Sequence, residues 1–194
     1  MRTLSIDFAA HDGHIACVDG DAAKALRPAF RVNDTAMIPL LEGVLEDAGW
    51  TKDDVERIAC SVGPGGFTSV RGGVAFANAL ADRLGVPAGG WHGSALALAR
   101  CPAALWMHST KADALFALGG PWTEPTLVTL ADALAAAKGG VTVTGDLTEA
   151  HRGALAGAGA AFPEPAGLER VLPAFLDALS YQKGGLAPWY GRGL

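Results

Sequence analysis

The stretch from residue 57 to residue 84 constrains the fold more than any other part of this 194-residue chain. It opens with an apolar run, 57–62, that has the length of a buried strand. A turn with three glycines follows at 63–66, and a helical pattern runs over 70–84 after a Thr-Ser pair at 68–69 that suits a helix N-cap. Because N–H groups at a helix N-terminus point toward one place, this order of strand, turn and helix predicts an anion-binding geometry.

Three other interpretations of this stretch are weighed, and the sequence argues against the first two. A P-loop has Gly-Lys-Ser/Thr at the start of its helix, whereas Val70-Arg71-Gly72 stands there in this chain. A dinucleotide-binding fold usually carries its glycines after the first strand, whereas this turn follows a predicted fourth strand. The third alternative is a tight strand–helix connection that binds no ligand.

The turn and the start of the helix resemble a motif of the TsaB (YeaZ) family, whose members are relatives of the TsaD/Gcp proteins once labelled M22 glycoproteases. That motif reads Gly-Pro-Gly-Ser-Phe-Thr-Gly-Leu-Arg-Ile-Gly, and this chain has Gly63-Pro64-Gly65-Gly66-Phe67-Thr68-Ser69-Val70-Arg71-Gly72-Gly73. Shorter agreements occur at 4–7, 35–45, 93–99 and in the Pro-Trp-Tyr-Gly-Arg ending at 188–192. The resemblance is good over residues 1–100 and thin over 101–187.

The resemblance implies an α/β fold of the actin/Hsp70-like (ASKHA, ribonuclease H-like) type with two related lobes, the second reduced. We expect an N-terminal lobe over 1–100, with the glycine turn and the interface helices, and a shortened C-terminal lobe over 101–194. The resemblance also implies a role in making N6-threonylcarbamoyladenosine (t6A) at position 37 of tRNA. In that family TsaB is a non-catalytic subunit that binds the transferase TsaD and the ATPase TsaE.

The resemblance also implies a nucleotide site at the end of the first strand and at the glycine turn. The sequence of this chain supports that site only weakly. Two departures from the family pattern argue against tight binding: Phe8-Ala9 replaces a small hydroxyl after the aspartate, and the Ser and Gly of the turn are exchanged. We therefore expect no required cofactor and leave ATP or ADP as open ligands, with loop capping as the alternative role of the aspartate. The residues of this site would be Asp7, Gly63, Pro64, Gly65, Gly66, Phe67, Thr68 and Arg71.

Two predicted helices, 34–48 and 70–84, supply the expected partner surface. The second is apolar nearly all round, and such a helix is normally covered on two sides. In the family, these helices meet those of a second TsaB or of TsaD; the alternative is that the latter half of this chain covers them. We expect charge at Leu41 or Ala77 to abolish association without unfolding. The surface would comprise Met37, Ile38, Leu41, Leu45, Gly73, Val74, Ala77 and Ala81.

The histidines and cysteines lack the spacing of a catalytic or metal site. The His-x-x-x-His pair that TsaD-like relatives use for a metal is missing, as are Cys-x-x-Cys, His-Glu-x-x-His and Gly-x-Ser-x-Gly. His11 and His14, on either side of a predicted turn, are expected at the surface. We therefore predict no catalytic residue and no metal. A scaffold is preferred to the alternatives, an actin-like nucleotide hydrolase or an M22-type glycoprotease.

Composition limits the partners. The net charge of −5 argues against a protein that grips tRNA alone, so we expect tRNA only through a complex with TsaD and TsaE homologues, or a homodimer through the same helices. Three cysteines in apolar stretches indicate buried thiols in a reducing cytoplasm. No apolar run reaches the length of a membrane span.

The remaining elements follow from hydrophobic patterning and turn residues. We expect Gly157-Ala158-Gly159-Ala160 to be a flexible connector, and the tail from residue 184 to be loose until Trp189 and Tyr190 pack. Strands are predicted at 3–8, 14–19, 25–32, 87–91, 103–108, 114–118 and 141–146, and further helices at 93–100, 127–137 and 167–179.

Overall fold

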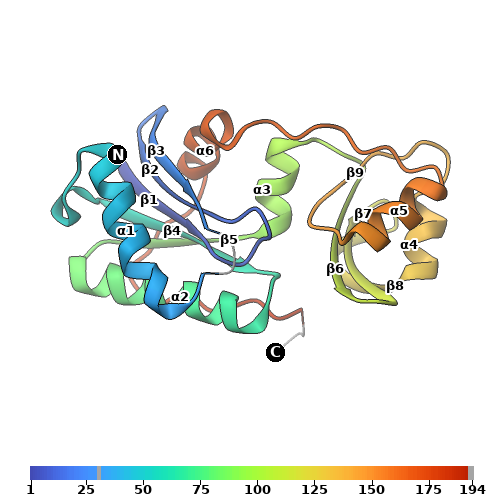
Figure 1. The fold of residues 1–194 in the computed structure, drawn as a ribbon, viewed down its shortest axis with the longest axis horizontal. Coiled ribbons are helices and arrows are strands. Elements are labelled where there is room, and N and C mark those ends of the chain that lie inside the picture. Colours follow the sequence, from blue (N-terminus) through green and yellow to red (C-terminus); the bar gives the residue numbers. More distant parts are fainter. Residues whose placement is uncertain (30–31, 192–194) are drawn as a thin grey trace. The chain divides into compact units, whose positions relative to one another are not determined.

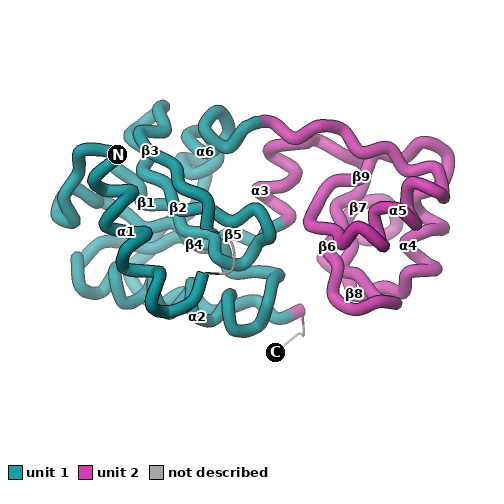
Figure 2. The backbone as a smooth tube through the Cα atoms, in the orientation of Figure 1, with its two compact units in different colours: residues 1–93, 167–190 teal, residues 94–166, 191–194 magenta. Residues whose placement is uncertain are grey.

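The computed structural model describes residues 1–29 and 32–191 (Figure 1). Figure 2 shows the described chain as two compact units, one made of residues 1–93 and 167–190, the other of 94–166 with Gly191. The predicted division into 1–100 and 101–194 differs from this one, because the last helix and the segment after it return to the first unit.

The first unit is built on a five-stranded mixed sheet with the order β3-β2-β1-β4-β5. Strand β1 pairs antiparallel with β2 and parallel with β4, so that Leu4 lies between Cys17 and Ile58. A bulge between Cys17 and Val18 shifts the register of β3. The strands are β1 (Arg2–Asp7), β2 (His14–Asp19), β3 (Ala22–Pro28), β4 (Arg57–Gly63) and β5 (Ala88–His92).

The two faces of this sheet differ because successive side chains of a strand point to opposite sides. Leu4 and Ile6 belong to the apolar core beneath α1 (Asp34–Ala48) and α2 (Phe67–Leu84). Thr3, Ser5 and Asp7, which alternate with them along β1, are polar and buried. Helix α6 (Leu168–Asp177) packs over that side, with Phe175 in edge contact with Trp91 at 5.8 Å. Figure 1 shows α1 and α2 on one side of the sheet and α6 on the other.

Helix α1 begins and ends where the sequence predicts. The side chain of Asn33 accepts the N–H of Ala36, and Gly49 closes the last turn. Helix α2 begins earlier than predicted, at Phe67, with Gly66 in the N-cap position and no side-chain cap. Thr68 and Ser69 therefore lie inside its first turn, and their predicted capping role is wrong.

The second unit repeats the order of the first in a smaller form. Three antiparallel strands are followed by a helix, a strand parallel to the first, and a second helix, with the sheet order β8-β7-β6-β9. Among the described residues of this unit, no strand takes the place of β5. The elements are α3 (Gly93–Arg100), β6 (Leu105–Lys111), β7 (Ala114–Gly119), β8 (Trp122–Thr129), α4 (Leu130–Ala136), β9 (Val143–Thr144) and α5 (Glu149–Gly157).

Several element predictions are wrong, two in the second unit and one in the first. Residues 127–129, assigned to a helix, belong to β8, because Thr129 is the N-cap of α4 and the helix starts only after it. Helix α5 occupies 149–157, where no helix was predicted. The third strand ends at Pro28, four residues earlier than predicted, and Phe30 and Arg31 lie outside the described residues.

None of the helices within 1–29 and 32–191 combines the length and hydropathy that a transmembrane span requires. All three cysteines are free and buried, as predicted.

Candidate functional site

The glycine turn and Asp7 lie at the same edge of the first sheet, as the sequence predicts. Strand β4 ends at Gly63, which pairs with His92 at the end of β5, and Asp7 ends the parallel neighbour β1. The carboxyl ends of parallel strands are a usual place for ligands in α/β sheets. This edge of the first unit is therefore the candidate site.

Asp7 caps the loop after β1. Its Oδ1 accepts the N–H groups of Ala9 at 2.9 Å and Ala10 at 3.1 Å, and the side chain is buried. Burial raises the pKa of Asp7 from the usual 3.8 to about 6, and the two N–H donors hold back part of that rise. These contacts are those of a loop-capping aspartate, the alternative role considered for Asp7.

The glycine turn is a place where main-chain segments pass close to one another. A Cβ on Gly65 would lie 2.5 Å from the carbonyl oxygen of Ala9, and a Cβ on Gly63, whose φ is +113°, would lie 2.9 Å from the carbonyl oxygen of Trp189. Two carbonyl oxygens, which carry partial negative charge, therefore approach the turn.

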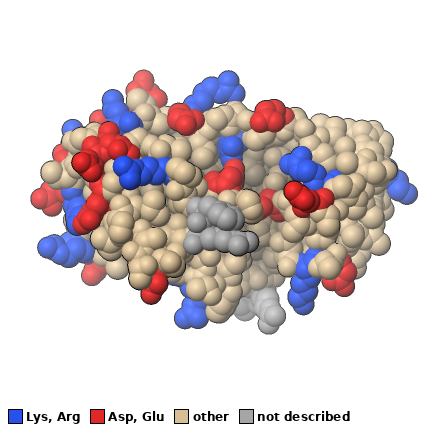
Figure 3. All heavy atoms as spheres, in the orientation of Figure 1, with Lys and Arg blue, Asp and Glu red and all other residues tan. Residues whose placement is uncertain are grey.

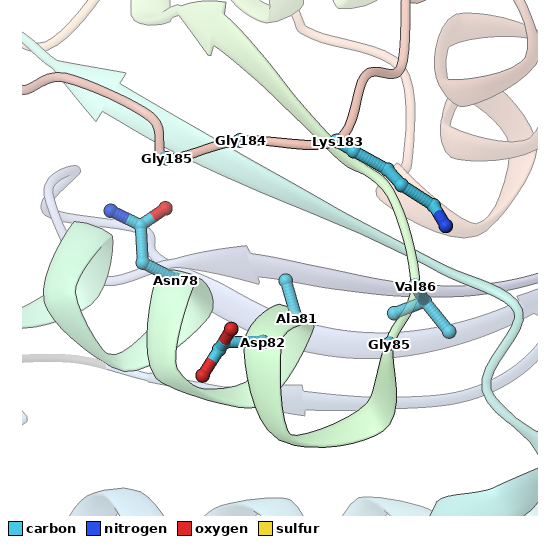
Figure 4. Close-up of a pocket in the computed structure, with 8 residues that line it drawn as sticks. All are labelled: Asn78, Ala81, Asp82, Gly85, Val86, Lys183, Gly184 and Gly185. Atoms are coloured by element: carbon cyan, nitrogen blue, oxygen red, sulfur yellow. The ribbon is translucent and has the colours of Figure 1, made fainter.

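The C-terminal segment, residues 182–190, is held along the first unit more firmly than predicted. Gln182 exchanges two main-chain hydrogen bonds with Ala88, and the Asn78 side chain bonds both the N–H and the carbonyl of Leu186, at 2.8 and 3.0 Å. Between these attachments the segment spans a hollow of about 330 Å³ beside α2 (Figure 4). Attachment therefore begins well before Trp189.

The segment ends in two aromatic residues beside the glycine turn. The Trp189 N–H bonds the carbonyl of Val62 at 2.8 Å, and its ring meets His92 edge-on at 4.4 Å. Tyr190 packs on Phe67, with ring centroids 5.2 Å apart. Arg192, the last residue of the ending that resembles the family, lies outside the described residues.

The start of α2 exposes part of the predicted site. Thr68 and Arg71 are exposed, and the guanidinium of Arg71 lies 5.1 Å from the centre of the Phe67 ring. The Phe67 side chain is 60% exposed, although it is large and apolar. These residues face solvent, whereas Gly63 and Pro64 are buried in the turn.

Seven of the eight residues predicted for the partner surface are buried in this chain. They belong to the core that α1 and α2 form on their own sheet, and only Ile38, 47% exposed, faces solvent. The helices are thus largely covered by their own unit, and the expectation that charge at Leu41 or Ala77 leaves the fold intact is wrong, because both side chains are buried in the core. The buried residues are Met37, Leu41, Leu45, Gly73, Val74, Ala77 and Ala81.

Two serine–histidine pairs, each with a buried histidine, were not predicted from the sequence. His14, expected at the surface, is buried, and its Nε2 lies 2.9 Å from Ser5 Oγ. In the second unit, His151 Nδ1 lies 2.7 Å from Ser109 Oγ, and its Nε2 lies 3.0 Å from the Ala112 carbonyl. The first pair could have been suspected from strand alternation, because Ser5 points to the face of the sheet opposite that of Leu4 and Ile6. Across the described parts of the chain, no three His, Cys, Asp or Glu side chains cluster as metal ligands.

Comparisons with known proteins find similarity over part of the chain. A family model described as TsaD, tRNA N6-adenosine threonylcarbamoyltransferase, matches residues 29–103. The tRNA N6-adenosine threonylcarbamoyltransferase of Chlorobium luteolum is 39% identical over 59 residues, which make up 30% of this chain. The matched residues span only 17% of that relative's length.

Solved structures match a larger share of the chain. YeaZ from Pseudomonas aeruginosa superposes with a TM-score of 0.56 at 18% identity, over 74% of this chain and 75% of that one. A second Pseudomonas aeruginosa structure, of an uncharacterized protein with similarity to peptidase YeaZ, gives 0.56 at 19% identity over 66% of each chain. The ROK hexokinase of Thermus thermophilus gives 0.50 at 15% identity over 91% and 98%.

The topology and these neighbours define an α/β protein of the actin-like (ASKHA) class, with a repeated unit that is reduced in its second copy. The predicted fold class is confirmed. Within that class, residues 29–103 are similar to the TsaD family, and the fold is similar to that of the YeaZ structures.

Proposed function

We propose that this chain is a non-catalytic partner of a TsaD-type threonylcarbamoyltransferase and takes part in forming t6A at position 37 of tRNA. The TsaD family match over residues 29–103 and the YeaZ-like fold support this pathway. In this proposal the chain binds the transferase and a TsaE-type ATPase in the cytoplasm, requires no cofactor and meets tRNA through the complex. Self-association is the alternative use of the same surface.

One observation carries the non-catalytic part of the proposal: the carbonyl oxygens of Ala9 and Trp189 approach the glycine turn. An actin-like enzyme that turns over nucleotide needs N–H groups and cations where phosphate charge lies. Here the carbonyl oxygens of Ala9 and Trp189 lie close to Gly65 and Gly63, and the nearby carboxyl of Asp7 accepts two N–H groups of its own loop. The turn therefore serves the packing of the first unit.

The surface charge supports tRNA contact through a partner. Figure 3 shows Lys and Arg interspersed with Asp and Glu on the viewed face. Clustered basic residues are what neutralise phosphates when a protein grips RNA by itself. An acidic chain of this kind is better suited to binding a protein that carries the RNA.

Because most of the predicted interface residues are buried, we propose a different part of α1 and α2 as the docking surface. The outward side of α1 carries Ile38 between acidic residues, Asp34 and Glu42, while the start of α2 exposes Phe67 and Arg71. We place the partner on these outward residues rather than on the buried ones that the sequence predicted.

The test is reconstitution of the modification from purified proteins. Unmodified tRNA, a threonylcarbamoyl donor, the TsaD-type transferase of the same organism and the ATPase are mixed with or without this chain, and t6A is measured by mass spectrometry of digested tRNA. The proposal predicts t6A only when this chain is present, at a rate that saturates as it reaches the amount of transferase. Equal t6A without the chain would contradict it.

A nucleotide hydrolase is the second candidate, because Asp7 and the glycine turn do lie at the same sheet edge. Phosphate release from Mg-ATP by the chain alone, abolished by Asp7→Asn, would favour it. Release no faster than in buffer would favour the partner role.

A further inference from the structure

We propose that Phe67, Arg71 and Tyr190, here called the aromatic patch, are the energetic centre of the docking surface. The occupant we infer is a protein surface with an apolar pocket and a carboxylate at its rim. For the identity of that protein, the inference rests on the proposed function and takes the TsaD-type transferase.

The aromatic patch is exposed although its members are the residue types that interfaces bury. The Phe67 and Tyr190 side chains are 60% and 42% exposed, and their rings pack at 5.2 Å with planes tilted by 36°. Arg71 lies over the Phe67 ring at 5.1 Å. Aromatic residues and arginine at the centre of an interface contribute most of the binding energy in measured complexes.

The patch is also held in place from two distant parts of the chain. Phe67 and Arg71 lie on the first two turns of α2, while Tyr190 follows the Trp189 N–H that bonds Val62. Upstream, Asn78 fixes Leu186 with two hydrogen bonds. Rings fixed before binding lose little conformational entropy on binding, which favours a docking role over a loose, accidental exposure.

Charge selects the chemistry of the partner. Residues 61–81 contain no Asp or Glu, so Arg71 has no acidic neighbour along this stretch of sequence. A carboxylate on the partner would complement it, and the acidic chain as a whole disfavours a polyanion such as RNA.

The test is calorimetric titration of the full chain with the TsaD-type transferase of the same organism. Phe67→Ala and Tyr190→Ala should each weaken binding at least about tenfold, the effect of losing a hot-spot side chain. Arg71→Glu should weaken binding more than Arg71→Lys. Leu127→Ala, which removes a side chain 57% exposed in the second unit, is the matched control and should bind like the wild type.

The results separate this inference from the proposed function. Unchanged affinity of the Phe67 and Tyr190 variants, with normal binding by the wild type, would overturn the aromatic patch and leave the proposed function standing. No binding by the wild type would overturn the proposed function itself. Variants that keep transferase affinity but lose affinity for an unmodified tRNA transcript would overturn the protein-docking inference in favour of RNA. Circular dichroism melts of each variant establish that the fold is retained.

Discussion

The main-chain N–H of Trp189 donates a 2.8 Å hydrogen bond to the carbonyl oxygen of Val62, and so ties the end of the described chain to strand β4. The same crossing brings the Trp189 carbonyl to the glycine turn, one residue further along β4. Carbonyl oxygens from two distant segments thereby lie against a turn for which the sequence predicts an anion-binding geometry. The close packing of this turn leads directly to the first prediction.

Substitution of the turn glycines should destabilise the first unit. Gly65→Ala places a methyl group against the Ala9 carbonyl, and Gly63→Ala adds a strained φ, so each should lower the free energy of unfolding by about 1–3 kcal/mol. Urea unfolding followed by tryptophan fluorescence measures this. Gly153→Ala in α5, where a Cβ meets no atom within 4 Å, is the control and should be neutral or stabilising by up to about 1 kcal/mol. Equal effects at all three positions would contradict the close packing.

Loss of the Asn78 side chain should release the C-terminal segment. Asn78→Ala removes both hydrogen bonds to Leu186, which leaves the rest of the segment without its middle attachment. Amide hydrogen exchange at 186–190 should speed up by about tenfold or more, whereas Asp82→Ala, one turn further along α2, should leave it unchanged. Protection that survives Asn78→Ala would show that Trp189 alone holds the segment.

Stability should depend on pH through Asp7. Its pKa of about 6 in the folded protein lies above the usual 3.8, so the folded state keeps this proton between those values while the unfolded chain loses it. The contribution of Asp7 to stability is therefore greatest below about pH 4 and falls by about 3 kcal/mol as the pH rises past 6.

Asp7→Asn is the variant that isolates this effect, because its amide oxygen still accepts the N–H groups of Ala9 and Ala10. Relative to the wild type, its free energy of unfolding should rise by about 2 kcal/mol between pH 4 and pH 7, measured by urea unfolding at both values. A difference between the two proteins that stays constant with pH would contradict a raised pKa.

The Ser109–His151 pair should stabilise the second unit. Ser109 Oγ also accepts the N–H of Thr148, the N-cap residue of α5, so Ser109→Ala leaves the Thr148 N–H and the buried His151 ring without this partner. We expect a loss of about 1–3 kcal/mol, read as faster amide exchange at Thr148. Thr126→Ala removes an exposed hydroxyl that bonds only a neighbouring carbonyl, and should cost less. Equal exchange in the two variants would argue that the pair is incidental.

Local patterning predicted the first unit well, because its elements carry their own start and stop signals. Gly49 marks the end of α1, and the apolar run from Arg57 marks β4. The second unit was harder to predict: alanine-rich stretches such as 133–137 and 154–158 suit helix, turn and connector alike. There, Thr129 and Thr148 are the N-caps that decide where helices begin.

The position of the candidate site could be predicted from the sequence. The contacts that the site makes could not. The motif located the glycine turn and its edge of the sheet, but the partners of Gly63 and Gly65 come from Trp189 and Ala9, which lie 126 and 56 residues away in sequence. The prediction of the partner surface failed for a similar reason. Amphipathic patterning shows that Leu41 and Ala77 are covered, and it does not tell whether the cover is the chain's own sheet or a second molecule.

Calorimetric titration of the full chain with Mg-ATP tests most directly whether the glycine turn is a backbone crossing or a phosphate site. With the Ala9 and Trp189 carbonyls at the turn, we predict no saturable heat at millimolar nucleotide. Saturable binding with micromolar affinity, lost on Asp7→Asn, would contradict the closed turn and the non-catalytic role built on it.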